Sequence, residues 1–295
     1  MAASDRGAAA AATWRVERLA AADAEGLCPL SIEAGWNQVA ADWRLMLNLG
    51  QGFGVRGDDG RWIGSALALP LGPSLSWISM VLVTGPARGR GLGTKLLSRA
   101  LAEAEANGAA AGLDATELGR PIYLPLGFRD AFTLSRWHVG EGARQVVPPP
   151  AGLTVRPAQR EHAARIAAYD GPRSGFARGA ILEHLLGRAP RLAHVALRPD
   201  GTLAGYVLGR DGYRRPHVGP LVADDEAIGL ALLSSAVAAA AEPPLVDVPD
   251  HHAVIRGWLV EQGGSAPRRF TRMLRGDVVA DDAAHVFALA GPELG

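Results

Sequence analysis

The chain has 295 residues, 48% of them hydrophobic and 20% charged, which is the balance of an ordinary globular protein long enough for two domains. Thirty Lys and Arg against thirty Asp and Glu leave no net charge, which argues against a nucleic-acid partner, because such proteins normally carry a basic excess. One cysteine excludes an internal disulfide. The most apolar helical segment, 227–241, is too short to span a bilayer of about 30 Å, so we expect a cytoplasmic protein without a membrane partner.

The first half of the sequence alternates strand and helix patterns. After a flexible tail at 1–12, strands are predicted at 14–19, 52–56, 62–69, 75–83, 113–116 and 129–139, and helical sequence at 21–49, 91–107 and 121–126. Residues 140–152, with three consecutive prolines at 148–150, predict a stiff linker.

The second half of the sequence repeats the first. Residues 59–64 match 200–205 at an offset of 141, and 96–98 match 232–234 at an offset of 136. The constant order of the matches indicates a duplication. We therefore predict two α/β domains of one fold, at 13–139 and 153–295.

A glycine-rich turn joins the fourth predicted strand to a helix. Gly89, Gly91 and Gly93 let the backbone turn tightly and approach a ligand. The helix start offers unpaired N–H groups and a positive dipole end, and Arg88 and Arg90 add charge, so the segment predicts an anion site. Its spacing fits neither a Walker A loop nor a dinucleotide fingerprint, but it does read Arg-x-x-Gly-x-Gly.

This turn resembles the pyrophosphate-binding turn of the GCN5-related N-acetyltransferases, the GNAT superfamily. About thirty residues later, 120–128 resemble the Tyr-x-x-Leu-Gly-Phe helix end of that superfamily. Residues 35–43, 113–121 and 289–295 resemble its tandem YitH-like subfamily, so the resemblance covers nearly the whole chain. It implies two tandem GNAT folds, each a mixed, mostly antiparallel central sheet flanked by helices.

The resemblance also implies a co-substrate, acetyl-CoA or another acyl-CoA, and no metal. The residues expected to bind the coenzyme lie on the fourth strand and the turn: Met80, Val81, Leu82, Val83, Arg88, Gly89, Arg90, Gly91, Leu92, Gly93 and Thr94. A backbone N–H of that strand would polarise the thioester carbonyl. Tyr123 stands where the family keeps its general acid.

The general base is the main departure from the family. Several relatives place a glutamate on the fourth strand, but residues 77–83 contain no acidic side chain. Asp114, on the fifth strand, is a candidate base, or alternatively a carboxylate that caps a loop or orients substrate. Water-mediated proton removal and an already neutral amine are further alternatives. Pro125, inside the short helix after Tyr123, is a second departure.

The acceptor is expected to be an amine of a small molecule, bound in a cleft that the second half completes. The candidate substrate-binding residues are Trp36, Asn37, Asp42, Thr116, Tyr206 and Asp250. Trp36 and Trp43, seven residues apart, fit either core packing on a helix or an aromatic wall of the acceptor site. Residue types leave the acceptor, the acyl chain beyond acetyl and the choice between monomer and homodimer open.

The second half carries a degenerate copy of the site. Residues 224–226, Asp-Asp-Glu, align with 88–90, and Leu259 aligns with Tyr123. Three carboxylates would repel a pyrophosphate. We therefore expect a structural lid there, with Tyr213, Arg214 and His217 among its candidate contacts.

These features predict an N-acyltransferase in which the amine attacks acyl-CoA directly in a ternary complex. Two alternatives stay open: other acyl-thioester chemistry, such as hydrolysis or carrier-dependent transfer, and a non-catalytic acyl-CoA-binding module.

Overall fold

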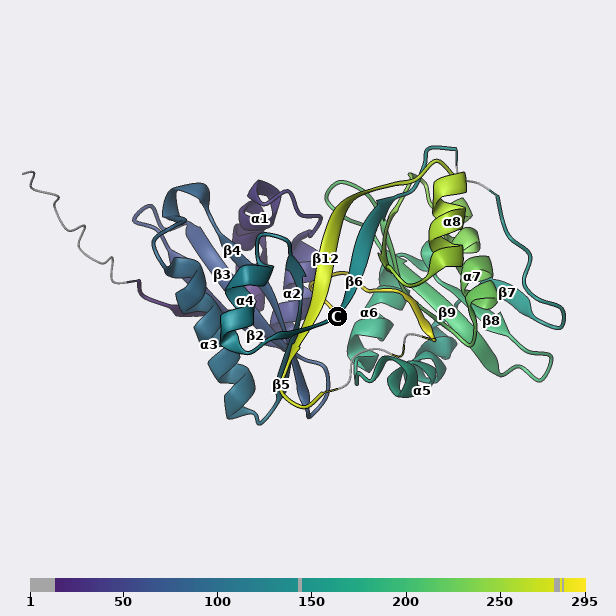
Figure 1. Ribbon diagram of the computed structural model, residues 1–295, viewed down its shortest axis with the longest axis horizontal. Coiled ribbons are helices and arrows are strands. Elements are labelled where there is room, and N and C mark those ends of the chain that lie inside the picture. The colour runs from purple at the N-terminus through teal and green to yellow at the C-terminus, as the bar shows by residue number, and fades with distance from the viewer. Residues whose placement is uncertain (1–13, 143–144, 279–281, 283) are drawn as a thin grey trace, which may run out of the picture.

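The computed structural model describes residues 14–142, 145–278, 282 and 284–295, and these form two α/β halves on one continuous thirteen-stranded sheet (Figure 1). The first half runs from β1 to β6 and the second from β7 to the C-terminus. This arrangement confirms the predicted mixed, mostly antiparallel fold class. The tail predicted at 1–12 lies outside the described residues.

The elements of the first half follow the predicted order. They are β1 (Glu17–Leu19), η1 (Ala21–Asp23), α1 (Ala24–Glu33), α2 (Ala40–Leu49), β2 (Gln51–Arg56), β3 (Trp62–Pro70), β4 (Leu75–Val83), η2 (Gly85–Ala87), α3 (Leu92–Ala106), β5 (Ala110–Thr116), α4 (Arg120–Tyr123), η3 (Leu124–Leu126) and β6 (Arg129–His138). The helical stretch predicted at 21–49 is broken in the middle, because Gly35 adopts φ 71° just after α1 ends.

The second half repeats this order of strands and helices. Its elements are β7 (Thr154–Pro157), η4 (Arg160–His162), α5 (Ala163–Ser174), α6 (Gly179–Arg188), η5 (Pro190–Leu192), β8 (His194–Leu197), β9 (Leu203–Arg210), β10 (His217–Ala223), α7 (Glu226–Ala239), β11 (Leu245–Pro249), α8 (Ala253–Glu261), β12 (Ser265–Arg275) and β13 (Val286–Ala288).

The two halves exchange one strand each at the centre of the sheet, where the strand order is β5-β12-β6-β11. Strand β12 of the second half pairs with β5 of the first, and β6 of the first half pairs with β11 of the second. Strands β12 and β6 also pair antiparallel with each other along most of their length (Figure 1). The linker predicted at 140–152 therefore joins two halves whose sheets are continuous.

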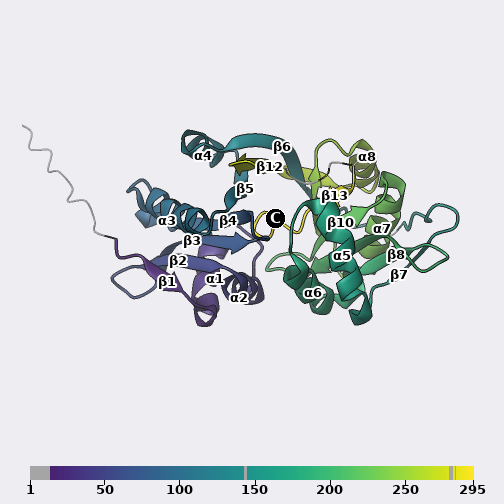
Figure 2. The same ribbon diagram turned by 90° about the horizontal axis from the view of Figure 1, so that it is seen from below.

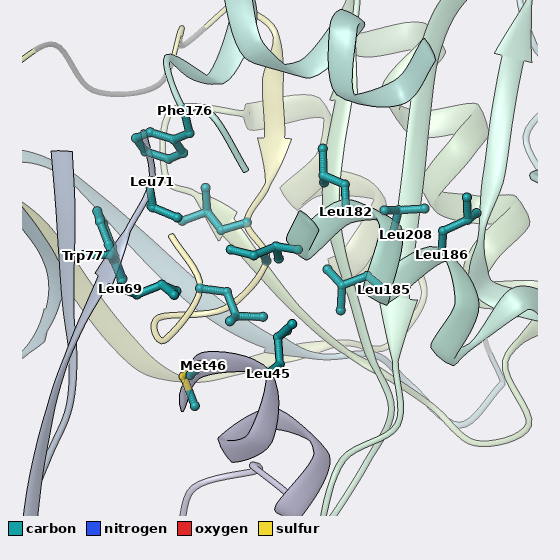
Figure 3. Close-up of a cluster of buried hydrophobic side chains, with 14 of the residues drawn as sticks. Leu45, Met46, Leu69, Leu71, Trp77, Phe176, Leu182, Leu185, Leu186 and Leu208 are labelled. Carbon is teal, nitrogen blue, oxygen red and sulfur yellow. The ribbon is translucent and has the colours of Figure 1, made fainter. Parts of the chain in front are cut away.

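A hydrophobic core is shared between the halves. Figure 3 shows apolar side chains of β3, β4 and α2 facing those of α6 and β9 from the second half. Trp77 and Phe176 pack with ring centroids 6.1 Å apart. The C-terminus lies between the halves in both views (Figures 1 and 2), and Trp77 Nε1 donates to the carbonyl oxygen of Pro292 at 2.8 Å. The apolar side chains buried between the halves stabilise the arrangement of one half against the other.

Within the described part of the chain, no helix combines the length and the apolar character needed to cross a membrane.

Candidate active site

A cavity of about 630 Å³ opens where β4 and β5 diverge. The two strands pair in parallel only from Leu75–Trp77 opposite Ala110–Gly112, and beyond that point no pairing between them is recorded in the described residues. Ten of the predicted coenzyme residues line the cavity: Met80, Val81, Leu82, Val83, Arg88, Gly89, Gly91, Leu92, Gly93 and Thr94. Arg90 does not, because its guanidinium stacks over the ring of Trp14, 4.9 Å from the centroid.

The glycine-rich turn leaves the start of α3 open to a ligand. Gly91 is the N-cap residue, with φ 80°, and among the described residues no side chain caps the helix. Gly89 has φ 71°, and a Cβ built on either glycine would stand in open space. Among the described residues the first N–H groups of α3 therefore have no side-chain cap, the arrangement that favours an anion at a helix start.

Arg88 brings a positive charge to this turn. Its Nε donates to the carbonyl oxygen of Val83 at 2.9 Å, and Nη2 lies 3.5 Å from Glu33 Oε1. Glu33 Oε1 in turn accepts the N–H of Gly85 at 2.7 Å. The side chain of Arg88 stays 59% exposed, so its outer donors face the solvent side of the cavity mouth.

A β-bulge interrupts β4 at the cavity. Ser79 pairs with Leu67 but Leu82 pairs with Ser65, so that two residues, Met80 and Val81, face one residue of β3. Met80 has φ 52°, and its carbonyl oxygen accepts the hydroxyl of Ser65 at 2.8 Å. A bulge leaves backbone groups of the strand outside the regular ladder, and Met80 and Val81 both line the cavity.

Tyr123 lines the same cavity from the end of α4. Its ring packs edge-on against Phe128, with centroids 5.8 Å apart. Burial raises the pKa of Tyr123 to about 12, because a phenolate is poorly solvated there. The hydroxyl therefore stays protonated at neutral pH, as a proton donor requires. Pro125 stands in the first turn of η3, where proline is tolerated.

Asp114 also lines the cavity, but an arginine binds both oxygens of its carboxylate. Arg272 Nε and Nη2 each lie 2.9 Å from one oxygen of Asp114, and both side chains are fully buried. Arg272 comes from the exchanged strand β12, directly opposite Asp114 in register. A bidentate pair holds a carboxylate as an ion in one orientation, which favours the orienting role over that of general base.

Trp36 and Trp43, for which the sequence left core packing and an aromatic wall of the acceptor site open, have different surroundings in the structure. Trp43 is fully buried in the core, and its Nε1 donates to Ser31 Oγ at 3.0 Å. Trp36 lies outside the helices and lines the cavity, as does the predicted substrate residue Thr116. Trp36 is therefore a wall of the site, and Trp43 is part of the scaffold.

Asn37 and Asp42, predicted to bind substrate, do not line the cavity, and their side chains bind the two halves together. Asn37 Oδ1 accepts the N–H groups of Arg214 and Arg215 at 2.9 and 3.2 Å. Asp42 is fully buried and lies 2.6 Å from Arg188 Nη1 and 2.8 Å from Arg210 Nη1. The loop with Tyr213, Arg214 and Arg215 thus anchors the halves rather than contacting a ligand in the cavity.

Tyr206 and Asp250, also predicted to bind substrate, do not line the cavity either. Tyr206 is fully buried on β9, where its hydroxyl donates to Asp170 Oδ1 at 2.5 Å. Asp250 accepts the hydroxyl of Ser135 at 2.7 Å and pairs with Arg269 at 2.9 Å, outside the cavity lining. His217, a further candidate contact, is buried and lies 3.2 Å from Asp247. In the fold, all three side chains lie outside the cavity lining.

A second group of cavity residues, here called the acceptor end, consists of the predicted Trp36 and five residues that were not among the predicted substrate residues. It comes from the loop before α2, from β6 and β12, and from the C-terminal tail: Trp36, Gln38, Arg136, Arg268, Phe270 and Glu293. Most of these positions are far apart in sequence, and the strand exchange brings them together. One of these residues, Glu293, could have been found from the sequence, because it lies in the segment 289–295, which resembles the tandem subfamily.

The second half fills the place that corresponds to this cavity with its own chain. Strands β10 and β11 pair only from His217–Val218 opposite Leu245–Val246. Beyond that point β13 pairs with β10, and Leu289 N donates to the carbonyl oxygen of Asp247 at 2.9 Å. The C-terminal tail thus occupies the opening between these strands before it continues toward the first half.

The carboxylates that replace the glycine-rich turn in the second half all have internal partners. Asp225 caps α7 by accepting the N–H of Ile228 at 2.8 Å. Asp224 accepts the hydroxyl of Tyr169 at 2.7 Å and pairs with Arg173 at 2.8 Å. An anionic ligand at this helix start would meet carboxylates instead of free N–H groups.

Among the described residues, no group of three or more His, Cys, Asp or Glu side chains is placed to hold a metal ion.

Comparison with known proteins finds two matching family models. An acetyltransferase (GNAT) family model matches residues 15–124, and an acetyltransferase (GNAT) domain model matches residues 166–288. The search of curated proteins found no match.

Several solved structures resemble the whole chain. One is a putative acetyltransferase from Pyrococcus horikoshii, with a TM-score of 0.75 and 18% identity over 96% of both chains. A GCN5-related N-acetyltransferase from Sphaerobacter thermophilus has a TM-score of 0.61 and 18% identity over 91% of this chain and 97% of that one. A tandem GNAT protein from the clavulanic acid biosynthesis pathway has a TM-score of 0.60 and 18% identity over 91% and 100%. At this identity the likeness shows the fold alone.

Proposed function

The chain belongs to the GNAT superfamily, with two GNAT domains in tandem, and from this premise we propose that it is an acyl-CoA-dependent N-acyltransferase with one active site, in the first half. We propose acetyl as the acyl group and the amine of a small molecule as the acceptor. The observation that carries the proposal is that a single cavity is lined by the open glycine-rich turn, the bulged strand and the protonated hydroxyl of Tyr123.

The residues present fit the coenzyme. The free N–H groups at the start of α3 and the guanidinium of Arg88 would hold its pyrophosphate. The edge of β4 from Met80 to Val83 would pair with the pantetheine arm as an added strand does. The open space above Gly89 and Gly91 leaves room for the phosphates to approach the backbone.

The protein would contribute three things to the chemistry. The cavity holds a neutral amine, whose nitrogen attacks the thioester carbonyl carbon. Backbone N–H groups at the β4 bulge stabilise the negative charge that develops on the carbonyl oxygen. Tyr123 gives its proton to the sulfur as the carbon–sulfur bond breaks. The buried surroundings that raise the pKa of the phenol would also raise the basicity of the departing thiolate, so the two stay matched.

The proton lost by the amine would leave through water, and water would return a proton to Tyr123 after the thiol has formed. The carboxylate of Asp114 is held by Arg272 through both oxygens, so the proposal gives it an orienting role and assigns the attack to an amine that is already neutral.

Free CoA release tests this function. The purified protein is mixed with acetyl-CoA with and without a panel of amines, and products are identified by mass spectrometry, with Tyr123→Phe as the comparison. We expect release that depends on an amine and matches the acetylated product one to one. Release without any amine would support a hydrolase instead, and acetyl-CoA binding without turnover would support a binding module.

A further inference from the structure

The acceptor end of the cavity contains two buried oxygen atoms that lack hydrogen-bond partners. The side chains of Gln38 and Glu293 are 3% and 1% exposed. Among the described residues, nothing donates a hydrogen bond to Gln38 Oε1 or to Glu293 Oε2. Buried acceptors are almost always satisfied in folded proteins, and leaving one unpaired is costly. Two such atoms in residues that line one cavity indicate a ligand that brings N–H donors.

The rest of Glu293 is firmly held. Its Oε1 accepts from Arg210, which also pairs with Asp42, and both partners are buried. The C-terminal tail that carries Glu293 is fixed by the bond from Trp77 to Pro292 and by Arg178, whose Nη1 donates to the carbonyl oxygen of Gly295 at 2.8 Å. The carboxylate is therefore preorganised, with one oxygen left for a ligand.

The acceptor end also holds a cation without an internal counterion. Arg136 is neutralised by Asp247 through two bonds of 2.7 Å. Arg268 lies directly opposite Arg136 across β12 and β6, and in the described part of the chain no carboxylate lies within ion-pair distance of it. Burial and the neighbouring charge of Arg136 lower the pKa of Arg268, with a smaller contribution from Arg214, while Asp247 acts in the opposite direction. A ligand anion placed here would offset part of the repulsion and of the desolvation cost of Arg268.

A carboxylate matches the guanidinium of Arg268. Arginine pairs with a carboxylate through two parallel hydrogen bonds, so one carboxylate would supply the ion-pair partner that Arg268 lacks among the described residues. The indole of Trp36 and the ring of Phe270 line the same end, so the groups between the amine and the carboxylate would face apolar walls.

We propose that the acceptor is an amine that also carries a carboxylate, of the amino-acid class, with Arg268 pairing with the carboxylate while Gln38 and Glu293 accept N–H bonds from the amine. The inference rests on the proposed function and names the substrate class of the same site. Two acceptors on the N–H groups of a neutral amine leave its lone pair free, as attack on the thioester requires.

The experiment compares matched acceptors on the unaltered protein. The panel contains the proteinogenic amino acids, their amides, their decarboxylated amines, and phosphoethanolamine. We expect kcat/KM for at least one amino acid to exceed that of its own amide and amine by about a hundredfold. Acetylation confined to amines without a carboxylate, or a preference for phosphoethanolamine, would overturn the inference.

The variant Arg268→Gln assigns the preference to its residue. It should raise KM for the amino acid at least tenfold and leave the amide unaffected, with KM for acetyl-CoA unchanged. Arg269→Gln is the matched control, because Arg269 is the next residue and pairs with Asp250 outside the cavity. Equal effects of the two variants would contradict the role of Arg268.

Acetyl-CoA binding, measured by calorimetry on the same preparations, separates the two proposals. If acetyl-CoA fails to bind, the proposed function fails. If it binds and amines without a carboxylate are acetylated, only the inference about the acceptor fails. If it binds and no amine of the panel is acetylated, the inference is overturned and the binding-module alternative gains support.

Discussion

Replacement of Tyr123 by phenylalanine removes one hydroxyl and almost nothing else. The ring keeps its edge-on contact with Phe128, and among the described residues no hydrogen bond to the hydroxyl is recorded. The free energy of unfolding should therefore change by less than about 0.5 kcal/mol. A fall in activity would then report chemistry and not folding.

The expected loss in kcat is about 10²–10⁴-fold, the usual contribution of a positioned general acid. This corresponds to about 3–5 kcal/mol of transition-state stabilisation. The dissociation constant of acetyl-CoA should stay within about twofold, because the pyrophosphate site lies at the glycine-rich turn. Tyr213→Phe, on an exposed loop of the second half, is the control and should keep full activity.

The pH profile follows from the direction of the pKa shift. Because the pKa of Tyr123 is about 12, the acid form persists as the pH rises from 7 through 10. The rate should therefore rise with pH as the acceptor amine loses its proton, and Tyr123 should not limit it until the pH approaches 12. Initial rates of CoA release from pH 6 to 10 measure the rise with pH and the absence of a fall caused by Tyr123, and thermal unfolding over the same range checks that the protein stays folded.

Turnover of Tyr123→Phe at the wild-type rate, with acetyl-CoA binding intact, would refute the assignment of Tyr123 as the general acid.

Three further outcomes are expected. Arg88→Glu should weaken acetyl-CoA binding at least tenfold by calorimetry, whereas Arg61→Glu, on an exposed turn that does not line the cavity, should not; equal affinities would disprove the phosphate assignment. Asp42→Asn should cost about 3–5 kcal/mol of unfolding free energy in denaturant titrations, because it leaves two buried arginines with less compensation. The control Asp59→Asn, at an exposed position, should cost less than about 1 kcal/mol. Similar losses of unfolding free energy in the two variants would contradict the structural role of Asp42. Burial opposes ionisation of Asp42, but Arg210 and Arg188 outweigh it and lower its pKa. Its stabilisation is therefore present above about pH 4 and lost as the pH falls through the folded pKa. Unfolding free energies from pH 6 to 3 should fall more steeply for the unaltered protein than for Asp42→Asn.

Local pattern was enough to predict the strands, helices and coenzyme turn of the first half. The fourth strand was placed at 75–83, the bounds observed for β4. The glycines of the turn were found because their constraints are local, a positive φ and a helix start, whereas Tyr123 was found through the resemblance of 120–128 to the GNAT superfamily. Ten of eleven predicted coenzyme residues line the cavity for the same reason.

The polar residues of the acceptor end could not be predicted in this way, because polar side chains that line a cavity and those that bind the fold together look alike in sequence. Asn37 and Asp42 neighbour Trp36, yet they turn toward the second half while Trp36 and Gln38 face the cavity. Tyr206 lies on a strand buried along its whole length. Only tertiary contacts distinguish these cases.

The sequence by itself determined a duplicated α/β fold, one open anion site beside a tyrosine, and a second copy whose turn carries carboxylates. The tertiary structure decided that β6 and β12 exchange places, that Arg272 holds Asp114, and that the C-terminal tail fills the second opening and carries Glu293 to the first. These are pairings between segments that lie far apart in the sequence. Such pairings depend on which edges and charges meet once the whole chain is packed, and no local propensity encodes them.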